Sequence, residues 1–425
     1  MNSLTWENDI LLFAKLPVLE LARAYQTPLF VYDQDQILSR INEVKKIAKT
    51  YHNISIYYAS KAFLTLAMAK IIKDSHLGID VASRGELFIA LKGNIQPSDI
   101  LYHGNNKSIE DIHYAIEQGV RKFVVDSVDE LMHMKELTDQ INTHIEILIR
   151  IIPKIDDINT HKNITTGHHG SKFGIDMDLH LEQVASIIKE AEYLSFQGLH
   201  FHVGSQLFTN TFHLQAVEQV FKYMQQLREN YQIVIKEINI GGGFGIKYKE
   251  QDQPMPLQLF IEPIIKRIDD LANIFKFPMP KISIEPGRFI VGGTALILYT
   301  VGAIKPGTPS SFVAIDGGMT ENLRVALYQA QYDVICVNKT SHTLETYTVV
   351  GQACESTDLM VEHAKLPKLK RGDTLAFLQA GAYEHSLIHN FNKTLRPTVL
   401  MVHQGVERVI QQRETYEALI ARDFE

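Results

Sequence analysis

Short apolar runs alternate with longer amphipathic segments from residue 54 to residue 288. Within the amphipathic segments, apolar residues recur at helical spacing, as at Ile109, Ile112 and Ile116. The apolar runs are interpreted as eight strands: Ser55–Ala59, Gly78–Ala82, Ile100–His103, Lys122–Asp126, Glu146–Ile152, Gln197–His202, Glu237–Ile240 and Lys281–Glu285. Strands that alternate with helices are typical of a parallel sheet with crossover helices, and eight is the number in a closed (β/α)₈ barrel. The pattern therefore predicts an α/β fold built on a TIM-type barrel.

After Arg288 the pattern changes to apolar runs separated by Gly, Pro, Asn and Asp, with few helical segments between them. The runs interpreted as strands include Ala295–Val301, Phe312–Ile315, Asp333–Val337, Thr346–Val350 and Thr374–Leu378. This spacing is typical of an antiparallel β domain. The segment Thr27–Asp33 is also strand-like and is expected to join that domain. We therefore expect an N-terminal segment at 1–35, a barrel at 36–288 and a C-terminal β domain at 289–425.

Composition narrows the class of protein. With 425 residues, of which 45% are hydrophobic, the chain is long enough for two domains. A formal net charge of -7 and the lack of a basic run argue against a nucleic acid or an anionic membrane as partner. Met1–Phe13 lacks the basic cluster of a signal peptide, and the apolar stretch Phe289–Ile304 is too short to span a bilayer. Cys336 and Cys354 do not suggest a disulfide framework, so we expect a soluble, cytoplasmic protein.

Residues suited to catalysis fall at the carboxyl ends of the predicted barrel strands, where enzymes with this fold carry their sites. These residues are Lys61, Asp80, His202, the glycines of Gly241–Gly245, and Glu285. A lysine at such a place can be desolvated and serve as a nucleophile, although most lysines after strands are surface charges. The glycines let backbone N–H groups approach a phosphate, but they also fit a flexible turn.

Glu285 begins the run Glu285-Pro286-Gly287-Arg288, in which the carboxylate can pair with a pyridinium nitrogen or simply with Arg288. His202 can stack on an aromatic ring, act as a base or be a structural histidine, and Ser205 can donate to a phosphate. Together, the amine, the stacking group, the phosphate-binding glycines and the carboxylate are the set of groups found in a pyridoxal phosphate site.

Three further features lie outside the predicted strand ends. His168-His169 sits on a loop without the spacing of a metal site, so we expect no metal there. Cys354 and Glu355 lie in the predicted β domain, where a buried structural thiol would also explain the cysteine. Arg324 and Tyr328 are four residues apart and would share one face of a helix, where they could bind a carboxylate or form a surface pair.

A series of motifs resembles the diaminopimelate decarboxylase family, in the same order along the chain. The motifs are Tyr58–Ala62, Gly78–Ser83, His103–Lys107, Thr166-Gly167 with Ser171–Gly174, His202–Gln206, Gly241–Gly245, Glu285–Arg288, Cys354–Asp358 and Gly381–Tyr383. The resemblance runs from Thr27 to Tyr416, nearly the whole chain. It implies a fold-type III pyridoxal phosphate enzyme, with a barrel of the alanine racemase type, a β domain, and sites shared between the subunits of a homodimer.

The resemblance implies roles for individual residues toward pyridoxal 5'-phosphate. Lys61 would hold the cofactor covalently, His202 would stack on its ring, and Glu285 would face the ring nitrogen. Asp80 would belong to the same cofactor-binding set. The residues implied for the phosphate are Ser205, Gly242, Gly243, Gly287 and Tyr383.

The resemblance also implies a substrate, meso-diaminopimelate, which would be decarboxylated to L-lysine and CO₂ in the last step of lysine biosynthesis. This amino acid carries a head group at each end, so its site needs cations for the retained carboxylate and an anion for the distal ammonium. The residues implied for substrate binding are Arg288, Arg324, Tyr328, Tyr383 and Glu355. Glu355 would reach in from the partner subunit to the distal ammonium, and Cys354 beside it would be a candidate catalytic proton donor.

The chain departs from the family's usual pattern at three places. Val325 follows Arg324 where members usually carry proline, Glu384–His389 follows Gly-Ala-Tyr where they usually carry small residues, and His161–Ile164 is altered. Two alternatives are a decarboxylase of another amino acid with a distal carboxylate, of the siderophore-precursor type, and a non-catalytic pyridoxal phosphate protein. Retention of Glu355 argues against the first, and the β domain argues against the second.

Overall fold

The computed structural model describes residues 3–51, 54–155 and 171–424. The chain divides into two compact units. Unit 1 comprises Met1–Arg40, Ile246–Asp252 and Arg288–Glu425. Unit 2 comprises Ile41–Gly245 and Gln253–Gly287.

Unit 2 is a closed barrel of eight parallel strands, which confirms the architecture predicted from the apolar runs. The order around the ring is β10–β11–β12–β5–β6–β7–β8–β9. The strands are β5 (Ile54–Ala59), β6 (Gly78–Val81), β7 (Ile100–Tyr102), β8 (Lys122–Val125), β9 (Ile145–Arg150), β10 (Leu194–His200), β11 (Glu237–Asn239) and β12 (Lys281–Ile284). Parallel strands are covered on both faces, which explains why these segments are nearly continuous apolar runs.

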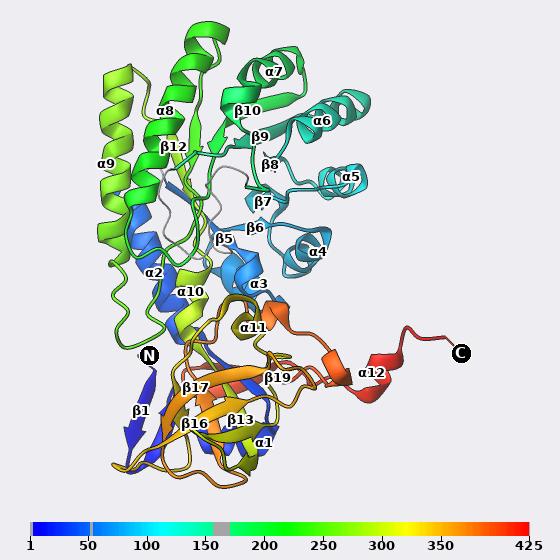
Figure 1. The fold of residues 1–425 in the computed structure, drawn as a ribbon. Helices are drawn as coiled ribbons and strands as arrows, with labels where there is room; N and C mark the ends of the chain where they lie inside the picture. Colours follow the sequence, from blue (N-terminus) through cyan, green and yellow to red (C-terminus); the bar gives the residue numbers. More distant parts are fainter. Residues whose placement is uncertain (1–2, 52–53, 156–170, 425) are drawn as a thin grey trace. The chain divides into compact units, whose positions relative to one another are not determined.

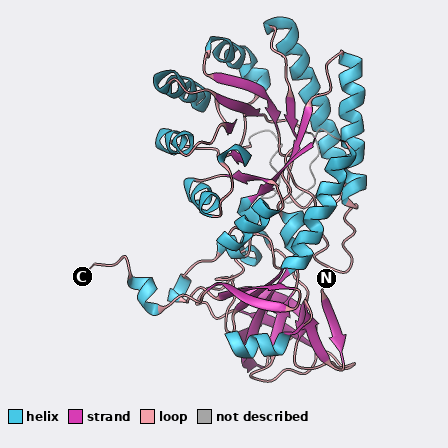
Figure 2. Ribbon diagram, turned by 180° about the vertical axis from the view of Figure 1, so that it is seen from behind, coloured by secondary structure: helices cyan, strands magenta, loops and turns pink. Residues whose placement is uncertain are grey.

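Helices cover the outside of the ring of strands (Figures 1 and 2). They are α2 (Gln34–Thr50), α3 (Leu66–Asp74), α4 (Arg84–Lys92), α5 (Ile109–Glu117), α6 (Val128–Ile141), α7 (Met177–Glu190), α8 (Thr211–Tyr231) and α9 (Leu257–Phe275). Thr65, Ser83, Ser108 and Ser127 cap α3 to α6, because each side chain accepts a hydrogen bond from a backbone N–H of the first turn. These caps satisfy donors that a helix start leaves unpaired, and so fix where each strand-to-helix loop ends.

Polar residues lie inside the barrel at the amino-terminal ends of its strands. Lys122 begins β8 and donates a hydrogen bond to Glu237, which begins β11, over 2.6 Å between Nζ and Oε2. Ser283 of β12 donates to the other oxygen, Oε1, also over 2.6 Å. All three side chains are buried, so each charge depends on its partner for compensation. This end of a barrel contributes to stability, whereas the opposite end carries the site.

Unit 1 is built on a mixed sheet in the order β17–β16–β14–β13–β4–β19–β20, with β18 paired to β13 and β15 paired to β18. Its strands are β4 (Leu29–Asp33), β13 (Ala295–Lys305), β14 (Ser311–Ile315), β15 (Val334–Cys336), β16 (Glu345–Val350), β17 (Leu359–Leu366), β18 (Thr374–Phe377), β19 (Thr398–His403) and β20 (Val406–Gln411). A separate small sheet holds β1 (Leu4–Glu7), β2 (Ile10–Phe13) and β3 (Leu16–Pro17). The helices of this unit are α1 (Val18–Tyr25), α10 (Arg288–Val291), α11 (Arg324–Tyr328) and α12 (Tyr416–Ile420).

The opening segment contributes β4 to the sheet of unit 1. This strand is buried at all five positions and lies between β13 and β19. Most pairings are antiparallel, as predicted, but β4 runs parallel to β19 and β14 runs parallel to β16. The β14–β16 pair can be parallel because the connection between them is long and includes α11 and β15. No helix within the described ranges is both long enough and apolar enough to cross a membrane.

Candidate active site

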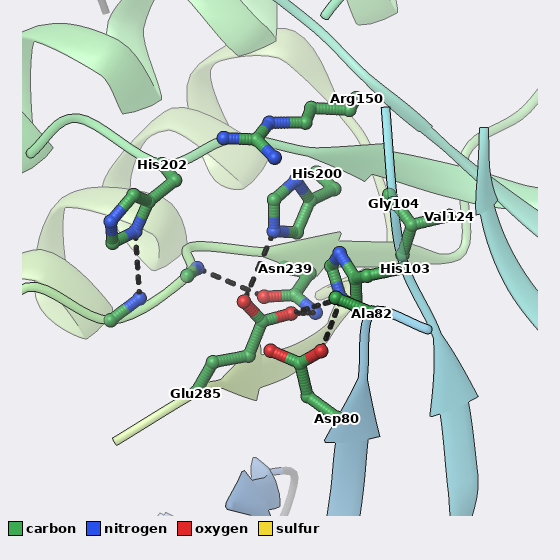
Figure 3. A network of polar contacts seen from close by, with 12 residues as sticks. Asp80, Ala82, His103, Gly104, Val124, Arg150, His200, His202, Asn239 and Glu285 are labelled. Atoms are coloured by element: carbon green, nitrogen blue, oxygen red, sulfur yellow. Dashed lines mark hydrogen bonds and ion pairs between the residues drawn. The ribbon is translucent and has the colours of Figure 1, made fainter. Parts of the chain in front are cut away.

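The carboxyl ends of the barrel strands bring most of the predicted cofactor residues into one region of unit 2. Lys61 lies in the short 3₁₀ turn Ser60–Ala62 directly after β5, and its side chain is exposed. Asp80 lies in β6, His202 follows β10 and Glu285 follows β12. Figure 3 shows the carboxyl groups of Asp80 and Glu285 beside the ring of His103, with the imidazole of His202 farther away.

Glu285 is the centre of a buried hydrogen-bond network (Figure 3). Its Oε1 lies 2.9 Å from Nε2 of His103 and accepts a hydrogen bond from Nδ2 of Asn239 over 2.7 Å. Its Oε2 lies 3.2 Å from Nε2 of His200. Burial alone would raise the pKa of Glu285, but the two histidines more than reverse this and hold the pKa well below its usual value. Burial lowers the pKa of His200 to about 4, so this ring is neutral and donates its Nε2–H to an ionised carboxylate.

Glu285 therefore remains ionised at neutral pH, and its carboxylate points into the barrel. Asp80 lies beside it, with Oδ1 3.8 Å from Nε2 of His103. Burial raises the pKa of Asp80 to about 6, although His103 acts in the opposite direction. In His103, His200 and Glu285, the atoms that could bind a metal ion lie within 4.8 Å of one another. The two ring nitrogens, however, already face the carboxylate oxygens of Glu285 as hydrogen-bond partners.

The glycine run after β11 lies against the same network. Gly242 N–H donates to Nδ1 of His202 over 3.3 Å, and Gly241 N–H donates to Oδ1 of Asn239 over 2.9 Å. A Cβ on Gly242 would lie 2.3 Å from the carbonyl oxygen of Glu285. The run is therefore not a loosely held turn, because its backbone touches neighbouring strand ends too closely for any side chain.

Gly243 and Gly287 are also closely packed. Gly243 has a φ of +96°, and a Cβ there would lie 2.3 Å from the carbonyl oxygen of Gly204, the residue before Ser205. Gly287 lies against the residues that flank Lys61, since a Cβ would be 3.0 Å from Cβ of Ala59. Strand-end backbones thus converge around the predicted phosphate-binding positions of unit 2.

His202 is a half-buried, neutral imidazole in this region. Burial lowers its pKa well below the usual value, and the positive charges of Lys61 and Arg150 lower it further. Its Nδ1 accepts the hydrogen bond from Gly242, which fixes the edge of the ring. A neutral imidazole held by one edge can present its face to an aromatic ring, which is the role implied by the resemblance.

The predicted substrate arginines meet in unit 1. Nη1 of Arg288 donates to the hydroxyl of Tyr248 over 2.5 Å, and Nη1 of Arg324 reaches the same hydroxyl at 3.3 Å. Tyr383, with a φ of 80°, places its ring 4.8 Å from the guanidinium carbon of Arg288 and 5.7 Å from that of Arg324. Both guanidiniums are more than nine-tenths buried. Such a pair of desolvated cations is suited to binding a carboxylate.

Tyr328, Cys354 and Glu355 are not part of that cluster among the described contacts. Arg324 and Tyr328 do share the short helix α11. Cys354 is exposed, so it is not a buried structural thiol, and its N–H donates to Oδ1 of Asn392 over 2.8 Å. Glu355 is also exposed, and within the described part of the chain its carboxylate accepts hydrogen bonds only from the neighbouring turn, residues 356 and 357.

Several site residues were not assigned a role from the sequence. His103 and Asn239 stand at strand ends, so the rule that selected Lys61 and Glu285 could have found them. His200 lies two residues before His202, and alternate residues of a strand face the same side. Tyr248 and Tyr332 gave no such signal, because they come from loops distant in sequence. Glu384 was noted only as part of the unusual segment after Gly-Ala-Tyr. His161–Ile164 and His168-His169 lie outside the described residues.

The sequence of the chain is similar to those of known proteins of one family. The pyridoxal-binding domain of the pyridoxal-dependent decarboxylases matches residues 35–292. Diaminopimelate decarboxylase of Bacillus subtilis is 38% identical over 411 residues, covering 96% of this chain and 93% of that protein. The Mycobacterium tuberculosis protein of the same name is 33% identical over 432 residues, covering 99% and 96%.

Solved structures agree with the sequence relatives. The crystal structure of diaminopimelate decarboxylase from M. jannaschii in complex with L-lysine superposes with a TM-score of 0.94 at 31% identity, and covers 100% of this chain and 98% of that one. The diaminopimelate decarboxylase from Helicobacter pylori, also complexed with L-lysine, gives a TM-score of 0.87 at 30% identity, with 95% and 98% covered. The chain therefore belongs to the diaminopimelate decarboxylase family of pyridoxal-dependent enzymes.

Proposed function

We propose that this protein uses pyridoxal 5'-phosphate to decarboxylate meso-diaminopimelate to L-lysine and CO₂, the last step of lysine biosynthesis. The observation that carries the proposal is the buried carboxylate of Glu285, held ionised by His103 and His200 at the carboxyl end of the barrel. A buried anion is stabilised by a cationic partner, and a protonated pyridine nitrogen can be that partner. Family membership supports the same reading.

The residues present fit the cofactor. Lys61 would hold it covalently, His202 would lie on its ring, and Glu285 would keep the ring nitrogen protonated, with Asp80 close by. The close backbone approach at Gly242 and Gly243 leaves no room for side chains, as expected where N–H groups surround a phosphate. The proposed phosphate-binding set is Ser205, Gly242, Gly243, Gly287 and Tyr383. When bound, pyridoxal phosphate supplies the electron sink that accepts the electron pair left behind as CO₂ departs.

The residues of the chain contribute charge and orientation. Glu285 stays deprotonated at neutral pH and can therefore hold a proton on a facing nitrogen throughout the reaction. We propose that Arg288, Arg324 and Tyr328 bind the carboxylate that is not lost. Such a contact at one end of the substrate fixes which of its two carboxylates reaches the reacting position.

The active site is proposed to be completed by a second copy of the chain in a homodimer. Cys354 and Glu355 are exposed on a turn of unit 1, which supports a role at a neighbouring subunit's site. Glu355 would bind the distal ammonium, and Cys354 would donate the proton that replaces CO₂ at Cα. Mixed Lys61→Ala and Glu355→Ala proteins, each inactive alone, should regain part of the activity when their subunits exchange. Verified exchange without recovery would refute the shared site.

The reaction is tested by CO₂ release from purified protein with meso-diaminopimelate, beside L,L-diaminopimelate, L-lysine and L-ornithine. We expect turnover of the meso isomer alone, together with the visible absorbance of bound cofactor. A protein that carries the cofactor but releases CO₂ from none of the four would refute the proposed substrate. It would favour a relative that acts on another amino acid with a distal carboxylate.

A further inference from the structure

Glu384 is a buried carboxylate attached to one of the proposed substrate arginines. It is 0% exposed, and its Oε1 accepts hydrogen bonds from Nη1 of Arg324 over 3.0 Å and from the hydroxyl of Tyr332 over 2.5 Å. Tyr332 also accepts from Nη1 of Arg324 over 2.7 Å. The glutamate follows directly on Tyr383.

The second oxygen of Glu384 makes the burial of this residue less favourable. Oε2 is buried and has no hydrogen-bond partner among the described residues. A buried carboxylate oxygen without a donor lowers the stability of the fold, and an apolar or small residue would avoid that cost. Asp373 of unit 1 also has a buried oxygen without a partner among the described residues, so an explanation for Glu384 has to come from its contacts.

The neighbouring charges supply that explanation. Arg288 and Arg324 both reach the hydroxyl of Tyr248, at 2.5 and 3.3 Å, so two buried guanidiniums lie close together. Like charges at this separation repel strongly where water is excluded. Glu384 offsets the repulsion, and because it holds Arg324 from one side it fixes the position of that guanidinium.

The hydrogen bonds of Arg324 show which edge is held. Within the described part of the chain, all of them use Nη1. A guanidinium has five N–H donors, and two of them on adjacent nitrogens can bind a carboxylate in a bidentate manner. Anchoring Nη1 to the protein therefore reserves the Nη2 and Nε groups for a ligand.

We propose that Glu384 is a positioning residue, which anchors Arg324 so that its remaining edge selects ligands carrying a terminal carboxylate. This inference rests on the proposed function, because it takes Arg324 to be the residue that binds the retained carboxylate. L-lysine keeps that carboxylate, whereas cadaverine, the diamine of the same length, lacks it. Comparing these two ligands isolates the contribution of the carboxylate.

The experiment measures the dissociation constants of L-lysine and cadaverine on cofactor-loaded protein by calorimetry, and KM and kcat for meso-diaminopimelate. Glu384→Ala should weaken L-lysine binding by about tenfold or more, the loss expected when a charge-assisted contact is misplaced. Cadaverine binding should stay the same, KM should rise, and kcat should change little. Glu384→Gln should restore most of the L-lysine affinity, because its amide oxygen can still accept from Arg324 and Tyr332.

Two further variants separate positioning from general damage. Asp373→Ala removes another buried carboxylate of unit 1, paired with Lys339 over 2.7 Å, and should leave the ratio of the two dissociation constants unchanged. Tyr332→Phe removes a donor to Glu384 and should weaken L-lysine binding selectively, which keeps the test valid if Glu384→Ala does not fold. Unchanged or tighter L-lysine binding in Glu384→Ala, or in Tyr332→Phe if only that variant folds, would overturn the inference. Wild-type protein that binds both ligands but does not release CO₂ would refute the proposed function alone.

Discussion

The carboxylate of Glu285 and the imidazole of His103 face each other at 2.9 Å, although 182 positions separate them in the sequence. The barrel creates this contact, because the carboxyl ends of β7 and β12 lie at the same end of the ring. His200 and Asn239 complete the set of partners from two other strands. The network fixes the carboxylate and keeps it charged, and both properties follow from closing the barrel.

Replacing Glu285 with glutamine should remove that charge while preserving the shape of the side chain. The amide can still accept a hydrogen bond, but it cannot hold a proton on a facing pyridine nitrogen. We expect kcat to fall by about 100-fold or more, within the usual range for losing an acid–base group. L-lysine should still bind, because Arg288 and Arg324 are untouched. Steady-state kinetics of the cofactor-loaded variant measure this, and an unchanged kcat would contradict the role given to Glu285.

The glycine run offers a test with a matched control. Gly243 and Gly372 have similar backbone angles, with φ of +96° and +87°, but a Cβ at Gly372 would meet nothing within 4 Å. Gly372→Ala should therefore cost only the backbone strain, about 1 kcal/mol of unfolding free energy, with no effect on cofactor binding. Gly243→Ala should in addition push Gly204 away and lower the affinity for pyridoxal phosphate. Titration of the apoprotein with cofactor compares the two, and equal affinities would rule out a phosphate site at Gly243.

The sequence predicts those features of the fold and site that follow from the regular alternation of strands and helices. The alternation of buried strands and amphipathic helices predicts the barrel, because parallel strands need long crossovers and are covered on both faces. The same pattern places Lys61 and Glu285 at strand ends. It could not predict the Arg324–Glu384 contact. Helix α11 and the turn after Gly381 are far apart in sequence, and only the folding of the sheet in unit 1 brings them together. Nor could it predict the parallel pairing of β4 with β19, since apolar alternation does not reveal strand direction.

The ion pair between Lys122 and Glu237 should matter for stability and not for catalysis. Lys122→Met would leave the buried Glu237 with a hydrogen bond from Ser283 and a longer ion pair with Lys281, whose Nζ lies 3.9 Å away. We therefore expect a cost at or below the value of about 3 to 5 kcal/mol that is typical when a buried pair loses one partner. Adding Glu237→Gln should recover much of this loss, because no uncompensated charge then remains. Urea unfolding of the single and double variants measures both effects. A double variant less stable than Lys122→Met would contradict this account, as would a large change in KM in either folded protein.

Stability should depend on pH through Glu321, a buried carboxylate of unit 1 that is 1% exposed. Burial raises its pKa from 4.5 to about 7, against the opposing effect of hydrogen bonds from Gly318 N–H and the hydroxyl of Thr320. Between these two pH values the folded protein keeps a proton that the unfolded chain has released. Raising the pH through this window therefore destabilises the fold, by about 3 kcal/mol once the pH is above 7.

Glu321→Gln should abolish this dependence, because glutamine stays neutral and its oxygen can still accept both hydrogen bonds. Relative to wild type, the variant should therefore gain stability between pH 5 and pH 8, and the gain should level off above the folded-state pKa of about 7. Denaturant unfolding of both proteins across that range measures the difference. Because all other titrating groups are shared, their contributions cancel in the comparison. A difference that stays constant with pH would mean that Glu321 ionises in the folded protein as it does in the unfolded chain.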